Sequence, residues 1–384
     1  MSGPRLFFAL IGISSLLFST IAYSQTIDTG ARHVFLYDMT TDTILLDKES
    51  DVPMPPASMS KLMTVYMVLE RLKSGSLSLD DKFLVSRKAW RKGGSKMFVM
   101  VNKRVSVRDL LRGIIVQSGN DACIVIAEGI SGSEEAFAET MTQKGKEIGL
   151  RESSFKNSHG YPARGHYMSA RDIATLSRRI IRDFPEYYKM FSETEFSFSG
   201  IKQGNRNPLL YKGFGADGLK TGYTQASGYG LVASVVRNKR RLLLVVNGFK
   251  SIRGRSSESA RLLDWGFRET KSYELFKKGD KIKGKKIENA DVWLGKTKKI
   301  TLAYGKDLTL TMSRKARQSL KVKISYKNPI AAPIKMGTSI GIVTVTAPSM
   351  DPIQIPILAG QEIQQLGFVG RMFNALKFLL FGKG

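Results

Sequence analysis

Three short motifs in the 384-residue chain place hydroxyl and amine side chains at spacings that suit acyl transfer. Nucleophilic acyl transfer requires a hydroxyl, a base that accepts its proton, and donors that stabilise an oxyanion. In Ser58-Met-Ser-Lys61, an i, i+3 spacing puts the hydroxyl and the amine on one helix face, one turn apart. Because an apolar helix starts here, its dipole favours negative charge at Ser58, and burial lowers the pKa of Lys61.

The pattern Ser-x-x-Lys alone is not specific, because it also occurs at Ser153 and Ser199 in polar, loop-like sequence. Two further motifs follow in order along the chain. Ser118-Gly119-Asn120 lies between two apolar helical stretches, and Lys220-Thr221-Gly222 precedes two apolar strands. Taken singly, the first could be a helix-capping loop and the second a solvated strand end. The ordered trio, however, is typical of penicillin-binding proteins and class A β-lactamases, although a glycine stands where their middle motif has aspartate.

The composition argues against several other kinds of site. One cysteine, Cys123, rules out a disulfide framework and a cysteine-based zinc site. The three histidines are scattered and lack His-Glu-x-x-His spacing, which argues against a metallohydrolase. We therefore expect an enzyme that uses no metal and no cofactor.

The elements that must position these motifs lie at both ends of residues 25–270. Short apolar runs at Val34–Tyr37 and Ile44–Leu46 predict a hairpin, and Tyr229–Val236 and Leu242–Phe249 predict two strands much later in the chain. Amphipathic helical patterns fill the middle, beginning with an apolar helix from residue 57. The sequence therefore predicts an α/β (α+β) domain, in which distant segments form one sheet around a helical insertion.

The composition changes near residue 271, where lysine and arginine become far more frequent than acidic residues. Short strand-like pieces separated by Gly, Asn and Pro predict a basic, all-β domain over residues 271–358. Residues 359–384 are expected to form an amphipathic helix. Its apolar arc, with Arg371 and Lys377 as cations, favours a membrane interface, and the alternative is a terminal helix that packs on its own domain.

The first 24 residues have the layout of an export signal. Arg5 precedes an uncharged apolar run, and Ala22-Tyr23-Ser24 is a small-x-small cleavage pattern. The alternative is an uncleaved membrane anchor, since the run is near the lower length limit for spanning. In either case, the remainder of the chain is predicted to be exported.

Four stretches of the chain resemble the low-molecular-weight penicillin-binding proteins that are serine-type D-alanyl-D-alanine carboxypeptidases of peptidase family S11. They are residues 56–64, 116–122, 215–224 and 262–267, and the likeness extends over roughly residues 30–270. The resemblance implies a serine β-lactamase/transpeptidase-like domain with an antiparallel sheet. It also implies a basic β domain and an amphipathic tail, which this family also carries.

The resemblance further implies a mechanism. Ser58 attacks the carbonyl between the last two D-alanines of a peptidoglycan stem peptide, and water then hydrolyses the acyl-enzyme. Lys61 accepts the hydroxyl proton as a neutral amine, because burial and the nearby Lys220 charge lower its pKa. Ser118 relays a proton toward the leaving amine, and Asn120 holds Lys61 and the substrate amide.

The same resemblance assigns residues to the substrate. The backbone N–H groups of Ser58 and Tyr223 form the oxyanion hole. Lys220 and Thr221 hold the terminal carboxylate, and Gly222 lets the substrate backbone approach closely.

An arginine is expected to help bind that carboxylate. Arg255 matches the family position, but Arg253 is close enough to remain a candidate, and either could instead be a solvated surface charge. His159 and His166 are interpreted as loop residues beside the cleft and receive no catalytic role.

Three alternatives to a carboxypeptidase stay open. A D,D-endopeptidase of peptidoglycan cross-links shares the motifs, as does a serine β-lactamase, which the β domain, the tail and Ser-Gly-Asn disfavour. The third is a non-catalytic wall or membrane adaptor that uses the strongly basic surface, since the formal net charge is +27.

The expected partners follow from the favoured interpretation. They are peptidoglycan stem peptides as substrates, β-lactam antibiotics as acylating inhibitors, and a membrane surface bound through residues 363–384. Export argues against nucleic acid as a partner. The protein is expected at the periplasmic face of the cytoplasmic membrane.

Overall fold

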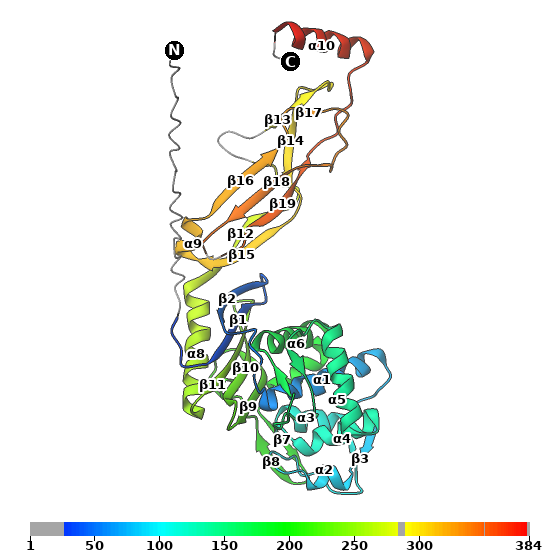
Figure 1. The fold of residues 1–384 in the computed structure, drawn as a ribbon, viewed down its shortest axis with the longest axis vertical. Helices are drawn as coiled ribbons and strands as arrows, with labels where there is room; N and C mark the ends of the chain where they lie inside the picture. The colour runs from blue at the N-terminus through cyan, green and yellow to red at the C-terminus, as the bar shows by residue number, and fades with distance from the viewer. Residues whose placement is uncertain (1–26, 283–288, 349, 382–384) are drawn as a thin grey trace, which may run out of the picture.

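The computed structural model describes residues 27–282, 289–348 and 350–381. Figure 1 shows a first body of helices and sheet built from the chain before residue 270, a second body of strands after it, and a separate terminal helix. The predicted export signal at residues 1–24 lies outside the described residues.

A five-stranded antiparallel sheet of order β2-β1-β11-β10-β9 is the centre of the first body. Its strands are β1 His33–Asp38, β2 Thr43–Lys48, β9 Ala216–Thr224, β10 Gly228–Arg237 and β11 Arg240–Phe249. The predicted hairpin is the pair β1 and β2, and the register places Leu36 of β1 opposite Leu244 of β11. The prediction that distant segments build one sheet is therefore confirmed.

Both faces of this sheet are covered, which explains why its strands are continuous apolar runs. Side chains alternate between the two faces of a strand. Phe35 and Tyr37 of β1 belong to the core beneath the helical insertion, while Val34 and Leu36 belong to the core beneath α8 Ile252–Glu269. Figure 1 shows α8 and the helices of the insertion on opposite sides of the sheet.

The helical insertion lies between β2 and β9. Its helix α1 is buried on nearly all sides, in keeping with its run of Leu, Met, Val and Tyr. Ser106 caps the N-terminus of α3, because its hydroxyl oxygen accepts a hydrogen bond from the backbone N–H of Asp109 in the first turn. The helices are η1 Ala57–Ser60, α1 Lys61–Ser74, α2 Arg87–Arg91, α3 Val107–Ile115, α4 Asn120–Ser131, α5 Glu134–Glu147, α6 Ala170–Asp183, α7 Pro185–Tyr188, η2 Lys189–Ser192 and η3 Pro208–Tyr211. Short strand pairs are β3 Lys82–Leu84 with β4 Arg104–Ser106, β5 Ser153–Ser154 with β6 Tyr167–Met168, and β7 Glu195–Phe198 with β8 Ile201–Gly204.

The second body confirms the prediction of β-rich structure after residue 271. β12 Thr270–Phe276 follows α8 without a loop and pairs with β15 Leu308–Ser313. A six-stranded sheet of order β16-β18-β19-β14-β13-β17 has an apolar core of its own. Its strands are β13 Asn289–Trp293, β14 Lys299–Tyr304, β16 Lys321–Tyr326, β17 Ile330–Ala331, β18 Ser339–Thr346 and β19 Ile353–Ala359. The strand pattern did not predict α9 Arg314–Gln318, a short polar helix with no buried residue.

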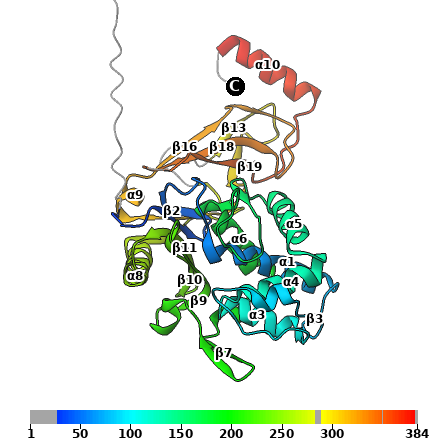
Figure 2. The same ribbon diagram turned by 60° about the horizontal axis from the view of Figure 1, so that its bottom comes forward.

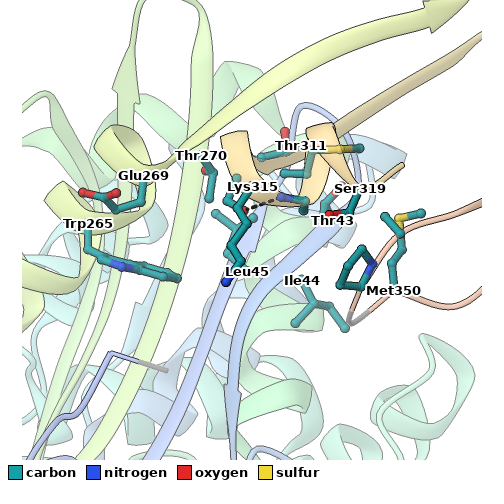
Figure 3. Close-up of a pocket in the computed structure, with 15 residues that line it drawn as sticks. Thr43, Ile44, Leu45, Trp265, Glu269, Thr270, Thr311, Lys315, Ser319 and Met350 are labelled. Carbon is teal, nitrogen blue, oxygen red and sulfur yellow. Dashed lines mark hydrogen bonds between the residues drawn. The ribbon is translucent and has the colours of Figure 1, made fainter. Parts of the chain in front are cut away.

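Polar contacts and a cavity join the two bodies. The fully buried Asp38 pairs with Arg240 Nε at 2.6 Å and accepts a hydrogen bond from Thr311 Oγ1 of β15 at 2.8 Å. Beside them lies a cavity of about 200 Å³. Trp265 of α8 and Lys315 of α9 are among the residues that line it (Figure 3). Because a buried carboxylate is costly to separate from its partners, this contact holds β15 against the first sheet.

The helix expected over residues 359–384 begins later in the structure, because Ile363 is buried in the core of the second body. Helix α10 Phe368–Phe381 lies beyond the far end of that body (Figures 1 and 2). Seven large apolar side chains of this helix are exposed, among them Val369 at 72%, Phe373 at 68% and Leu379 at 81%. None of the helices in the described part of the chain has the length and apolar character needed to cross a bilayer.

Candidate active site

Ser58 and Lys61 meet where η1 passes into α1. The helix predicted from residue 57 begins as a 3-10 turn that contains Ser58, and Lys61 is the first residue of α1. Residues i and i+3 are eclipsed in a 3-10 turn, and Lys61 Nζ lies 2.8 Å from Ser58 Oγ. The same amine donates a hydrogen bond to the carbonyl oxygen of His159 at 2.5 Å.

The Lys61 amine is completely buried, and its surroundings favour the neutral form. Burial, assisted by the positive charges of Arg206 and Lys92, lowers the pKa of Lys61 to about 8. The expected coupling to Lys220 acts on that residue, because burial, assisted by the positive charge of Lys61, lowers the pKa of Lys220 well below its ordinary value.

The second motif occupies the connection between α3 and α4. Ser118 has a φ of +62°, which few non-glycine residues adopt, and its Oγ accepts a hydrogen bond from Lys220 Nζ at 2.9 Å. Asn120 differs from the expectation that it holds Lys61. Its Nδ2 donates to the carbonyl oxygen of Gly93 at 2.9 Å, and its buried Oδ1 has no hydrogen-bond partner among the described residues.

Close packing explains why Gly119 stands where the related motif has aspartate. A Cβ at this position would lie 2.9 Å from Asp121 Oδ1 and 3.2 Å from the backbone nitrogen of Met97. The buried Asp121 carboxylate is itself held by the backbone N–H groups of Met97, Phe98 and Val99. Neither neighbour is free to move away, so the position requires glycine.

Strand β9 brings the third motif against η1. Lys220 and Thr221 are buried, and Gly222 faces the turn, where a Cβ would meet Met59 Cγ and the Pro56 carbonyl oxygen, both at 3.1 Å. The missing side chain therefore lets β9 approach η1 closely. Gly222 also lines the cavity, so the expectation that it makes room for the substrate stays a prediction.

One cavity of about 490 Å³ brings the three motifs together. Of the predicted site residues, those in its lining are Ser58, Ser118, Asn120, Thr221, Gly222, Tyr223 and Arg255. The amines of Lys61 and Lys220 lie within hydrogen-bond distance of the two serines. The lining includes Arg255 and not Arg253, which favours Arg255 of the two candidates.

Arg206 is a second cationic residue of this cavity, and the sequence did not indicate it. It lies in the loop after β8, where no local pattern marks it, and its guanidinium donates to Ser95 Oγ at 2.5 Å. Arg255, on α8, has an Nε with no partner in the described part of the chain. Burial lowers the pKa of both guanidinium groups. Two arginines in one cavity suit a planar anion such as a carboxylate.

A Ser–Lys pair, a second Ser–Lys contact and two arginines around one cavity define a serine acyl-transfer site for an anionic substrate. A family model described as D-alanyl-D-alanine carboxypeptidase matches residues 20–251, and a model of the penicillin-binding protein 5 C-terminal domain matches residues 271–365. The chain belongs to the D-alanyl-D-alanine carboxypeptidase family.

Individual relatives agree with this assignment. The D-alanyl-D-alanine carboxypeptidase DacA of Escherichia coli K12 is 35% identical over 358 residues, which cover 91% of this chain and 87% of the relative. The crystal structure of penicillin binding protein 5 from Haemophilus influenzae is 35% identical with a TM-score of 0.74, and covers 88% of this chain and 99% of that one. Penicillin-Binding Protein D2 from Listeria monocytogenes, in its ampicillin-bound form, is 27% identical with a TM-score of 0.58, over 63% and 99% of the two chains. The predicted family and fold are thereby confirmed.

Proposed function

We propose that this chain removes the terminal D-alanine from peptidoglycan stem peptides as a serine-type D-alanyl-D-alanine carboxypeptidase. The observation that carries the proposal is the contact between Ser58 and the buried Lys61 at a cavity that also holds Arg206 and Arg255. A free carboxylate distinguishes the C-terminal end of a peptide from its interior. Guanidinium groups bind carboxylates through bidentate hydrogen bonds, so the two arginines suit a substrate with a free C-terminus.

In the first step, Ser58 Oγ attacks the carbonyl carbon of the penultimate D-alanine. Lys61 accepts the hydroxyl proton, for which it needs a free lone pair, and its pKa of about 8 makes the neutral amine accessible near neutral pH. The developing oxyanion is assigned to the backbone N–H groups of Ser58 and Tyr223, both in residues that line the cavity.

The terminal D-alanine leaves only after its amine gains a proton. Lys220 donates a hydrogen bond to Ser118 Oγ, so a proton can pass from the lysine through the hydroxyl to the leaving nitrogen. A bound carboxylate favours the protonated form of Lys220. The C–N bond breaks, and water hydrolyses the remaining ester. The free Oδ1 of Asn120 gains a partner if a substrate amide N–H occupies the cavity.

Product analysis tests this function against its closest alternatives. The purified chain is incubated with a stem pentapeptide and, separately, with cross-linked peptide dimers. Free D-alanine from the pentapeptide is the expected product. Separation of the dimers with the pentapeptide left intact would identify an endopeptidase, and rapid turnover of penicillin would identify a β-lactamase.

Export and membrane attachment belong to the same proposal. The layout of residues 1–24 supports export to the periplasm. The exposed apolar side chains of α10, together with Arg371 and Lys377 on the same helix, support attachment to an anionic membrane surface.

Deleting residues 361–384 is expected to release the protein from membranes and to leave penicillin labelling intact, because the second body separates α10 from the cavity (Figure 1). Membrane fractionation with a fluorescent penicillin measures both properties. A full-length control carries Val369→Glu and Phe373→Glu, which add charge to exposed apolar positions and should also cause release. Truncated protein that stays on membranes after signal cleavage would contradict the assignment.

A further inference from the structure

The carbonyl oxygen that holds the Lys61 amine lies in a segment, residues 157–161, that no motif marked. His159 contributes this oxygen, and the carbonyl oxygen of Ser158 accepts a hydrogen bond from Thr64 Oγ1 of α1 at 2.6 Å. The segment is therefore bound to α1 at two points about one helical turn apart. The position of the Lys61 amine depends on where this segment lies.

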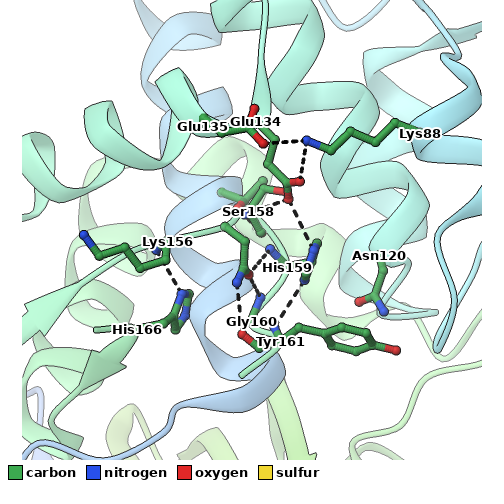
Figure 4. A network of polar contacts seen from close by, with 12 residues as sticks. Lys88, Asn120, Glu134, Glu135, Lys156, Ser158, His159, Gly160, Tyr161 and His166 are labelled. Carbon is green, nitrogen blue, oxygen red and sulfur yellow. Dashed lines mark hydrogen bonds and ion pairs between the residues drawn. The ribbon is translucent and has the colours of Figure 1, made fainter. Parts of the chain in front are cut away.

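A single buried carboxylate holds the segment from the other side, as Figure 4 shows. Glu134 is the first residue of α5, and its Oε1 accepts hydrogen bonds from the backbone N–H of Ser158 at 3.2 Å and from the Ser158 hydroxyl at 2.8 Å. His159 Nε2 lies 3.3 Å from the same oxygen. The other oxygen pairs with Lys88 Nζ at 3.1 Å. These partners compensate for the burial of the charge.

His159 contacts Glu134 as a neutral imidazole. Burial lowers the pKa of His159 to about 2, so the ring carries no charge near neutral pH. The backbone N–H of Tyr161 donates to Nδ1 at 3.2 Å, which leaves the ring proton on Nε2. Because that proton faces Glu134, the carboxylate selects one tautomer and one orientation of the ring.

Orientation matters because a neutral lysine has only one lone pair. To accept the Ser58 proton, the lone pair must point at Ser58 Oγ, yet the amine rotates freely unless its N–H groups are held. The hydrogen bond from Lys61 to the His159 carbonyl oxygen restricts that rotation. A misplacement of about 1 Å costs on the order of 100-fold in rate.

We propose that Glu134 is a positioning residue for proton transfer: it fixes the Ser158–His159 backbone, which in turn orients the Lys61 amine toward Ser58. Glu134 does not line the substrate cavity, and its hydrogen bonds to Ser158 join it to the segment that holds the Lys61 amine. The proposal rests on the role of Lys61 as base in the proposed function.

Glu134→Ala and its neighbour Glu135→Ala form a matched pair for the test. Glu135 also binds Lys88, at 2.8 Å, but its side chain is 73% exposed. In the reaction of the full chain with benzylpenicillin, the acylation rate at saturation should fall about 10- to 100-fold in Glu134→Ala. The half-saturating penicillin concentration should stay unchanged, because the cavity lining is intact. Glu135→Ala should react at the wild-type rate.

Two further readouts separate positioning from a merely structural role. Glu134→Gln keeps an oxygen that accepts from Ser158, so it should recover most of the rate. The deficit of Glu134→Ala should be equal at pH 7 and pH 9.5, because a misdirected amine stays misdirected after it loses its proton. Circular dichroism and melting temperature establish that each variant is folded.

The following results would overturn the proposal that Glu134 positions Lys61. Folded Glu134→Ala that reacts at the wild-type rate overturns it, and so does a deficit that disappears at pH 9.5, which would assign the effect to the protonation of Lys61 and not to its orientation. If Glu134→Ala does not fold, the double variant Ser158→Ala/His159→Ala removes both side-chain contacts to Glu134 and keeps the two carbonyl groups, and full rate in that variant overturns the proposal. Failure of the proposed function is distinguishable, since it would appear in the wild-type chain as no free D-alanine from the pentapeptide, whereas this proposal is tested by the acylation rates of the variants relative to the wild type.

Discussion

Replacing Ser58 with alanine is expected to abolish the penicillin adduct and to slow D-alanine release by about 10⁴-fold or more, because the variant has no hydroxyl to form the ester. The cavity, the arginines and the Lys61 amine all remain, so binding should persist without chemistry. Mass spectrometry of the intact protein after incubation with penicillin measures the adduct. Peptide mapping of the wild-type protein should place it on the peptide that contains Ser58.

Ser199→Ala is the matched control for this substitution. Ser199 begins another Ser-x-x-Lys pattern, but it lies exposed in the turn between β7 and β8, with a φ of +49°. Its alanine variant should form the adduct as the wild type does. An adduct that persists in Ser58→Ala, or one that maps to Ser118, would refute the assignment of the nucleophile.

The contrast between Ser58 and Ser199 shows which parts of the site a sequence pattern can predict. Apolar runs predicted the strands of the first sheet, since strands buried on both faces leave no other pattern. The order of the three motifs predicted that Ser58, Ser118 and Lys220 share a site, and the structure brings them to one cavity. Spacing could not show that Gly222 packs on η1, because that contact joins segments far apart in the chain.

Residues that act through the backbone or across the fold leave no such pattern. His159 contributes a carbonyl oxygen, which every residue possesses, and Arg206 lies in a loop between two asparagines. Glu134 lies in the first turn of a helix, where acidic residues are common because the helix dipole favours negative charge. Its sequence position therefore does not indicate a role in the site. Only the three-dimensional contacts distinguish these residues from their neighbours.

The second-order rate constant of acylation by penicillin is expected to rise about 90-fold between pH 6 and pH 9, because only the neutral Lys61 amine accepts the Ser58 proton. Below the Lys61 pKa of about 8, the neutral fraction falls tenfold for each pH unit, and above it the fraction approaches one. This rate constant reports the free enzyme, so its midpoint measures Lys61 before the ligand binds. A rate constant that is flat or falls over this range would contradict the role of Lys61 as base.

A charge substitution tests whether cations near Lys61 set the pH of that midpoint. Lys92 lowers the pKa of Lys61, so Lys92→Met should raise it and move the midpoint to higher pH, since the protonated amine then meets less repulsion. Lys73→Met removes an equal charge at the far end of α1 and should leave the midpoint in place. A shift in both variants would point to the net charge of the whole protein. A shift confined to Lys92→Met shows that nearby cations, together with burial, prepare the lysine to accept a proton.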